Sequence, residues 1–256
     1  MLNFNDVLSY YPAKLRPFRE NILKEYLQYQ ILNIVFSTGY STKLVFLGGT
    51  AIRIVHNSIR FSEDLDFDNT GLTKDDFGKV SKAIRKQLEL DGYNVEIENV
   101  FKGAFHCYIK FPGLLFQNEF SGQIKEKILI QLDAEPQKYT YQPEKFLLNK
   151  FGIFRHINTV PLNLLLSQKL CACLARKRSK GRDFFDVVYL MGKTEPDYKF
   201  LKKRLNIRTK KELINVLTKK SDTLDFKRLA QDIEPFLFDP AQKDRVVNFR
   251  NWLETI

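Results

Sequence analysis

Residues 44–68, LVFLGGTAIRIVHNSIRFSEDLDFD, constrain the fold and chemistry of this chain more than any other stretch. Residues 44–47 are apolar and run into Gly48 and Gly49, a pattern typical of a buried strand that ends in a sharp turn. Thr50 stands at the predicted N-cap of a helix of about two turns. Free N–H groups at such a helix start, next to glycines, favour the close approach of a phosphate.

Three carboxylates, Asp64, Asp66 and Asp68, alternate with apolar residues at the end of this stretch. In a strand they share one face, where their mutual repulsion is costly unless cations lie among them. Mg²⁺ is commonly bound by one or two carboxylates together with substrate phosphates. We therefore interpret the glycine turn and the acids as a nucleoside triphosphate site; the alternative is a solvated acidic strand edge after an ordinary strand–turn–helix.

The spacing of these two motifs is that of a known family. GGT at residues 48–50 precedes DLD at residues 64–66, inside RFSEDLDF, and thirteen residues separate them. In this the chain resembles the AbiEii/AbiGii toxin family of nucleotidyltransferases, which belongs to the DNA polymerase β-like nucleotidyltransferase superfamily. The family motif usually has serine where this chain has Thr50, and the hydroxyl group is kept. The resemblance covers about residues 40–190.

A second motif begins at Lys169, which stands in a strongly apolar segment predicted to be helical. Such a lysine either extends its amine to water or meets a fixed anion. After thirteen intervening residues come Asp183 and Asp186, three apart on one face of the next predicted helix. They either complement that helix's dipole or belong to the family's Lys…D-x-x-D motif. The resemblance implies that Lys169 neutralises phosphate charge and that Asp183 or Asp186 orients Lys169 or the acceptor.

Hydrophobic periodicity predicts an α/β (α+β) fold with a mixed sheet and flanking helices, and the resemblance implies that this is a nucleotidyltransferase core. Helices are expected over residues 17–36 and 73–90, and strands over residues 94–101, 105–111 and 124–133. From Pro161 the chain is expected to be helical to its end. We therefore predict a core domain over residues 1–158 and a basic helical domain over residues 159–256.

Asp133 closes the last of these predicted strands, ILIQLD. If that strand lies beside the Asp64–Asp68 strand, Asp133 completes a triad of carboxylates around the metals. The resemblance implies such a third acid on a neighbouring strand. Glu135 competes for the role, and an ordinary strand-end acid is the alternative.

Positive charge is concentrated in the predicted helical domain. Of the formal net charge of +11, residues 159–256 contribute +9, from 21 Lys and Arg against 12 Asp and Glu. Five cations in seven residues form what we call the basic cluster, which attracts a polyanion through counterion release or is simply a solvated turn between helices. Its members are Arg176, Lys177, Arg178, Lys180 and Arg182.

Together these features predict a metal-dependent enzyme that moves a nucleoside monophosphate from an NTP to an acceptor hydroxyl. Mg²⁺ or Mn²⁺ is expected on Asp64, Asp66 and Asp133. The triphosphate is expected on the glycine turn and Lys169, with further contacts from Arg60 and Ser62. The predicted nucleotide-binding residues are Gly48, Gly49, Thr50, Arg60, Ser62 and Lys169.

The resemblance further implies a toxin of a bacterial toxin–antitoxin or abortive-infection system. Its expected acceptor is RNA, at the 3′ end of tRNA, and its expected partner is a cognate antitoxin. One alternative is transfer to a small molecule such as an antibiotic, although a basic second domain disfavours a cationic acceptor. Another is a non-catalytic nucleotide-binding regulatory module. The sequence holds no membrane-spanning apolar run and no secretion signal, so we expect a cytoplasmic protein that does not enter a membrane.

Overall fold

The computed structural model describes residues 2–136 and 138–256, which form two compact units. The first, called the core unit below, runs to Asn57 and continues over Phe61–Thr159. The second, the helical unit, comprises Val160–Ile256 together with the short segment Ser58–Arg60. Within the described residues, no helix has the length and apolar character needed to span a bilayer.

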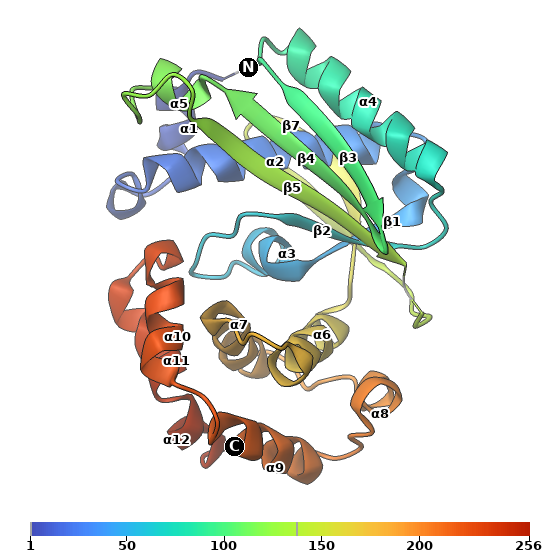
Figure 1. Cartoon of the computed structure of the whole chain (residues 1–256), viewed down its shortest axis with the longest axis vertical. Coiled ribbons are helices and arrows are strands. Elements are labelled where there is room, and N and C mark those ends of the chain that lie inside the picture. The colour runs from blue at the N-terminus through green and yellow to red at the C-terminus, as the bar shows by residue number, and fades with distance from the viewer. Residues whose placement is uncertain (1, 137) are drawn as a thin grey trace. The chain divides into compact units, whose positions relative to one another are not determined.

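The core unit contains a mixed seven-stranded sheet. Its strands are β1 (Leu44–Leu47), β2 (Leu65–Asn69), β3 (Glu96–Lys102), β4 (Ala104–Pro112), β5 (Lys127–Pro136), β6 (Glu144–Lys150) and β7 (Ile153–Thr159). They lie in the order β3-β4-β5-β2-β1-β7-β6 (Figure 1). β2 pairs with β5, and β1 with β7, in parallel; the other neighbours are antiparallel. This mixed sheet, with helices beside it, confirms the predicted α/β fold.

Two long helices cover one face of this sheet. They are α2 (Arg19–Ser37) and α4 (Lys74–Leu90), which contact each other and the strands. Both were predicted within a few residues, and α4 begins with a capping box in which the Thr73 hydroxyl accepts from the Asp76 N–H. Shorter helices complete the unit: α1 (Phe4–Ser9), α3 (Gly48–Ile54) and α5 (Leu114–Gln117), with 3₁₀ turns at Ala13–Leu15 and Ser41–Lys43.

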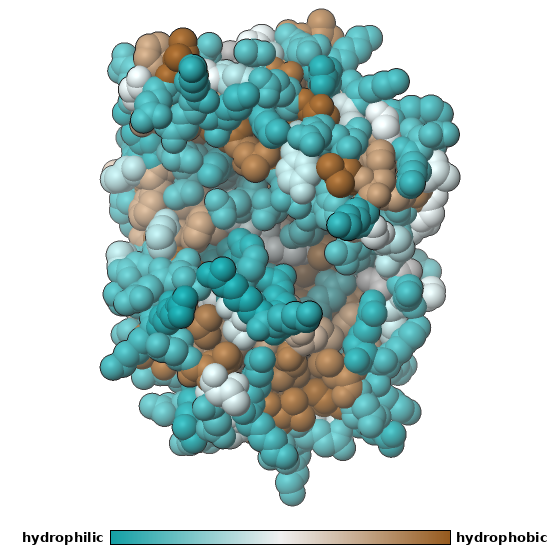
Figure 2. Space-filling view, in the orientation of Figure 1, coloured by the Kyte–Doolittle hydropathy of each residue, from teal (hydrophilic) through white to brown (hydrophobic). Residues whose placement is uncertain are grey.

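The helical unit follows β7. Its helices are α6 (Leu162–Ala175), α7 (Gly181–Met191), α8 (Tyr198–Leu205), α9 (Lys210–Ser221), α10 (Phe226–Ile233), α11 (Asp244–Val247) and α12 (Phe249–Leu253), with 3₁₀ turns at Glu234–Phe236 and Pro240–Lys243. α7 begins close against α10 at Gly181, where a Cβ would overlap the carbonyl oxygen of Leu229, so the position requires glycine. The inward faces of these helices are apolar, whereas hydrophilic residues predominate on the surface seen in Figure 2.

Candidate active site

The alternating acids of β2 lie on the face of the sheet opposite α2. Leu65 and Phe67 are buried, and the ring of Phe67 packs against Phe36 of α2. Because successive side chains of a strand point to opposite faces, Asp66 and Asp68 lie on the other face. Asp68 is itself buried and accepts a 2.5 Å hydrogen bond from the Tyr141 hydroxyl. The sheet therefore separates its apolar core from a face that carries carboxylates.

Asp66 and Asp133 are direct partners across the parallel pair of β2 and β5. Paired residues in neighbouring strands point to the same face, so Asp133 and Asp66 lie on one face of the sheet. The strand of Asp133 thus lies beside the strand of Asp66, the condition on which the predicted triad depends. Asp133 accepts from the Gln131 amide at 2.8 Å, and its Oδ1 lies 2.7 Å from Nδ1 of His106 on β4. Glu135, the competing acid, pairs with Asp68 and is exposed. Asp133 thus lies beside Asp66 with its carboxylate held on both sides.

Gly48 brings the glycine turn close to Asp66. Its φ is +82°, a conformation that favours glycine, and a Cβ at this position would overlap the carboxylate of Asp66. α3 starts at this residue and its N-cap is Leu47, so the prediction that Thr50 is the N-cap is wrong. The left-handed Gly48 completes the turn within one residue, and the helix therefore begins two positions before Thr50. The Thr50 hydroxyl instead donates to the backbone carbonyl of Asp64.

Replacing Gly48 by alanine tests this contact. We expect Gly48→Ala to lose about 1–2 kcal/mol of stability because of its backbone conformation, and to displace Asp66 and abolish nucleotidyl transfer. Gly92→Ala is the matched control, since Gly92 has a φ of +89° but nothing within 4 Å of its would-be Cβ. Melting temperature and transfer rate should separate the two, with only Gly48→Ala inactive. Full activity of Gly48→Ala would show that the close approach to Asp66 is not needed.

Buried polar side chains fix the segment before the acids. The amide of Gln28, a buried residue of α2, donates to the carbonyls of Ser62 at 2.9 Å and Glu63 at 2.8 Å. Together with the bond from Thr50 to Asp64, these contacts hold three successive carbonyls in place. The backbone conformation of the segment that leads to Asp64 and Asp66 is therefore set by side chains from both α2 and α3.

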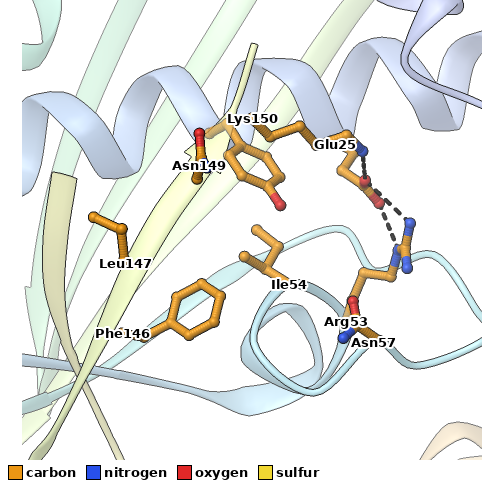
Figure 3. A pocket seen from close by; sticks show the side chains of 9 residues that line it. Glu25, Arg53, Ile54, Asn57, Phe146, Leu147, Asn149 and Lys150 are labelled. Atoms are coloured by element: carbon orange, nitrogen blue, oxygen red, sulfur yellow. Dashed lines mark hydrogen bonds and ion pairs between the residues drawn. The ribbon is translucent and has the colours of Figure 1, made fainter. Parts of the chain in front are cut away.

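The far end of α3 is tied down by a buried carboxylate. Glu25 of α2 accepts from Arg53 of α3 at 2.7 Å, from Lys150 of β6 at 3.0 Å and from the Tyr11 hydroxyl at 2.7 Å. Burial opposes its negative charge, but Arg53 and Lys150 outweigh burial and hold the pKa of Glu25 below its ordinary value. Figure 3 shows both cations directed at Glu25. These residues line a cavity of about 380 Å³. This cluster fixes α3, which begins with the glycine turn.

The predicted second motif lies in the helical unit as part of a continuous series of ion pairs, called the ion-pair chain below. Its order is Arg60, Asp186, Lys169, Asp183, Arg176. Arg60 makes two bonds to Asp186, at 2.7 and 2.6 Å. Lys169 lies 2.9 Å from Asp186 and 3.3 Å from Asp183, and Arg176 lies 2.9 Å from Asp183.

The ion-pair chain keeps Lys169 and Asp186 charged. Burial disfavours the ammonium of Lys169, but Asp186 and Asp183 outweigh burial and raise its pKa. Burial likewise opposes the charge of Asp186, yet Arg60 and Lys169 lower the pKa of that carboxyl. Asp186 therefore stabilises the fold at neutral pH, and this contribution is lost on acidification below the ordinary pKa of aspartate; that of Lys169 is lost only above the ordinary pKa of lysine.

Arg60 joins the ion-pair chain from the segment between α3 and β2. The Phe238 N–H donates to the Ile59 carbonyl at 3.1 Å, and Arg60 forms an isolated antiparallel bridge with Leu237. Arg60 and Asp186 are among the most buried charged residues, at 2% and 0% exposure. The structure thus gives Arg60 a carboxylate partner, while its predicted contact with phosphate stays a prediction.

Most of the basic cluster is exposed to solvent. Arg176, Lys177 and Arg178 lie in the exposed segment between α6 and α7, where a polyanion could reach them. Their role in binding RNA stays a prediction.

The carboxylates on one face of the sheet have the oxygen chemistry that Mg²⁺ and Mn²⁺ prefer. In residues 2–136 and 138–256, however, no three His, Cys, Asp or Glu side chains are grouped closely enough to hold a metal. The metal site therefore stays a prediction.

Comparisons with known proteins identify the family and support the fold. The family model described as nucleotidyl transferase AbiEii toxin, type IV toxin–antitoxin system, matches residues 31–253, well beyond the two motifs. The fold is similar to the crystal structure of JHP933 from Helicobacter pylori, with 18% identity, a TM-score of 0.55, and coverage of 92% of this chain and 91% of that one.

A second solved structure, a candidate nucleotidyltransferase from H. pylori, has 19% identity and a TM-score of 0.56, and covers 92% of this chain and 94% of that one. No curated protein matches the chain. The family match spans most of the chain and includes both motifs. The chain therefore belongs to the AbiEii nucleotidyltransferase toxin family of type IV toxin–antitoxin systems.

Proposed function

We propose that the protein transfers a nucleoside monophosphate from an NTP to a hydroxyl of RNA, at the 3′ end of tRNA, and releases pyrophosphate. The observation that supports this best is the pairing of Asp66 with Asp133, in contact with the left-handed Gly48. Carboxylates on two neighbouring strands, next to a turn that a side chain would block, form a site suited to a metal-bound triphosphate.

In this proposal Asp64, Asp66 and Asp133 hold Mg²⁺ or Mn²⁺. When bound, the metal polarises the phosphates and stabilises the attacking and leaving oxygens. The acceptor hydroxyl loses its proton to solvent, and its oxygen forms a bond to the α-phosphorus while the bond from that phosphorus to the pyrophosphate oxygen breaks. His106 and Gln131 orient the Asp133 carboxylate, through the contacts described above.

The triphosphate is proposed to bind at residues 48–50 and Ser62, with charge neutralised by Lys169. Asp183 and Asp186 orient Lys169, through the ion pairs they make with it. A fixed cation in a water-poor site stabilises phosphate charge more than a cation in water does. The proposed division of labour gives residues 1–158 the nucleotide and metal, and residues 159–256 the lysine motif and the RNA.

The basic cluster is the proposed grip on the RNA backbone, since exposed cations on one segment release counterions from a polyanion. A cognate antitoxin is the proposed partner, and the cytoplasm the proposed location. Transfer to a cationic small molecule is disfavoured by the +9 net charge of residues 159–256.

Incubation with each α-labelled NTP, Mg²⁺ and total RNA, followed by a denaturing gel, tests the proposal. We expect label on RNA of tRNA length from one or more α-labelled NTPs and none from the same NTPs labelled on the γ-phosphate, because pyrophosphate leaves. Asp66→Ala serves as the inactive control. Label on a small molecule instead of RNA would favour the antibiotic-type alternative, and no transfer to any acceptor would favour a nucleotide-binding module.

A further inference from the structure

The ion-pair chain has one member that differs from the others. It contains three cations and two carboxylates, so its net charge is +1. Each carboxylate is shared between Lys169 and one arginine: Asp186 with Arg60, and Asp183 with Arg176. The side chain of Arg176 is 42% exposed, whereas those of Asp183 and Lys169 are 1% and 12% exposed. Arg176 is therefore the solvent-exposed end of the ion-pair chain, where a solute can reach it.

Asp183 is the point through which Arg176 reaches Lys169. One oxygen of Asp183 faces Lys169 at 3.3 Å and the other faces Arg176 at 2.9 Å. Without Arg176, this buried carboxylate would have Lys169 as its one remaining partner in the ion-pair chain. The net charge of the ion-pair chain would then fall from +1 to zero. Both changes draw the ammonium towards Asp183 and weaken its attraction for a further anion.

We propose that Arg176 is a positioning residue that sets the affinity for nucleoside triphosphate by sharing Asp183 with Lys169. The inference rests on the proposed function, in which Lys169 contacts the triphosphate. It separates Arg176 from Lys177 and Arg178, its neighbours in the basic cluster, whose contribution is to RNA alone. One segment of the helical unit thus serves both substrates.

Nucleotide titrations of the full chain test this without RNA. Isothermal titration calorimetry with each of the four NTPs and Mg²⁺ gives a dissociation constant that does not depend on the acceptor. We expect Arg176→Gln to raise that constant about tenfold, Arg176→Lys to restore most of the loss, and the matched control Lys177→Gln to leave it unchanged. Lys177→Gln should instead reduce the salt dependence of RNA binding, by about 0.7–0.9 in log–log slope for a lost phosphate contact.

A double-mutant cycle shows whether Arg176 acts through Asp183. In an Asp183→Asn background the further change Arg176→Gln should have little effect, because there is no carboxylate left to share. A full effect in that background would mean a direct contact of Arg176 with the nucleotide and would overturn the inference. Equal dissociation constants for the parent and Arg176→Gln would overturn it too, whereas a parent that binds no NTP would overturn the proposed function itself.

Discussion

Replacing Asp66 by alanine is expected to reduce nucleotidyl transfer at least about a thousandfold while the chain stays folded. The reason is that loss of a catalytic metal ligand removes several kcal/mol of transition-state stabilisation, and each 1.4 kcal/mol is worth about tenfold in rate. The fold should survive, because the change removes one of two carboxylates paired on the same face, with Asp133 as the other. Transfer rate and melting temperature, each compared with the parent, give the result.

The neighbouring acid provides the control for this experiment. Asp68→Asn keeps an oxygen that can accept from the Tyr141 hydroxyl, so its fold and most of its activity should persist. An Asp66→Ala variant that keeps more than about a tenth of the parent rate would rule out Asp66 as a metal ligand, because less than about 1.4 kcal/mol would then have been lost.

Lys169→Met is expected to fold as well as the parent and to lose a hundredfold or more in kcat/KM for NTP. Methionine keeps much of the stem's packing. Both carboxylates keep an arginine, Asp186 with Arg60 and Asp183 with Arg176, so no buried charge is left alone. What is lost is one preorganised cation for the triphosphate, worth a few kcal/mol. Steady-state kinetics and thermal unfolding measure the two effects, and growth of cells without the antitoxin should become normal.

Arg60→Met is the matched contrast within the same ion-pair chain. It removes the bidentate partner of Asp186, which is 0% exposed, and should cost about 3–5 kcal/mol of stability. Unfolding of Lys169→Met would show that the lysine is structural. A fully active Lys169→Met would show that the motif has been assigned wrongly.

Local patterns in the sequence predicted the elements that carry their own signals. α4 has its capping box at Thr73 and an amphipathic face, and β1 has an apolar run that ends in glycine. By contrast, the hairpin of β6 and β7 was not assigned. Its turn places Phe151 at a φ of +58° beside Gly152 at +76°, where asparagine or aspartate is the usual first residue. The rings of Tyr26 and Tyr29 pack on Phe151 at 5.1 Å and hold it there.

The residues of the candidate site were likewise predicted only in part. The motif residues were found because their spacing is local, but their partners depend on tertiary structure. His106 contacts Asp133 only because β4 and β5 pair in that register, and Arg60 meets Asp186 across 126 residues of sequence. Gln28 and Glu25 are polar residues among the otherwise apolar or aromatic buried residues of α2, and that exception to the pattern was the one signal that could have singled them out.

The segment Ser58–Arg60 limits how this protein can be taken apart. It belongs to the helical unit although the residues on either side belong to the core unit. A fragment that starts at Val160 lacks Arg60, and one that stops at Thr159 has Arg60 without Asp186. Chimeras between relatives should therefore exchange residues 58–60 together with everything after Thr159, as a discontinuous module. In such libraries, the hybrids that fold should be those in which the residues at positions 60 and 186 can still pair.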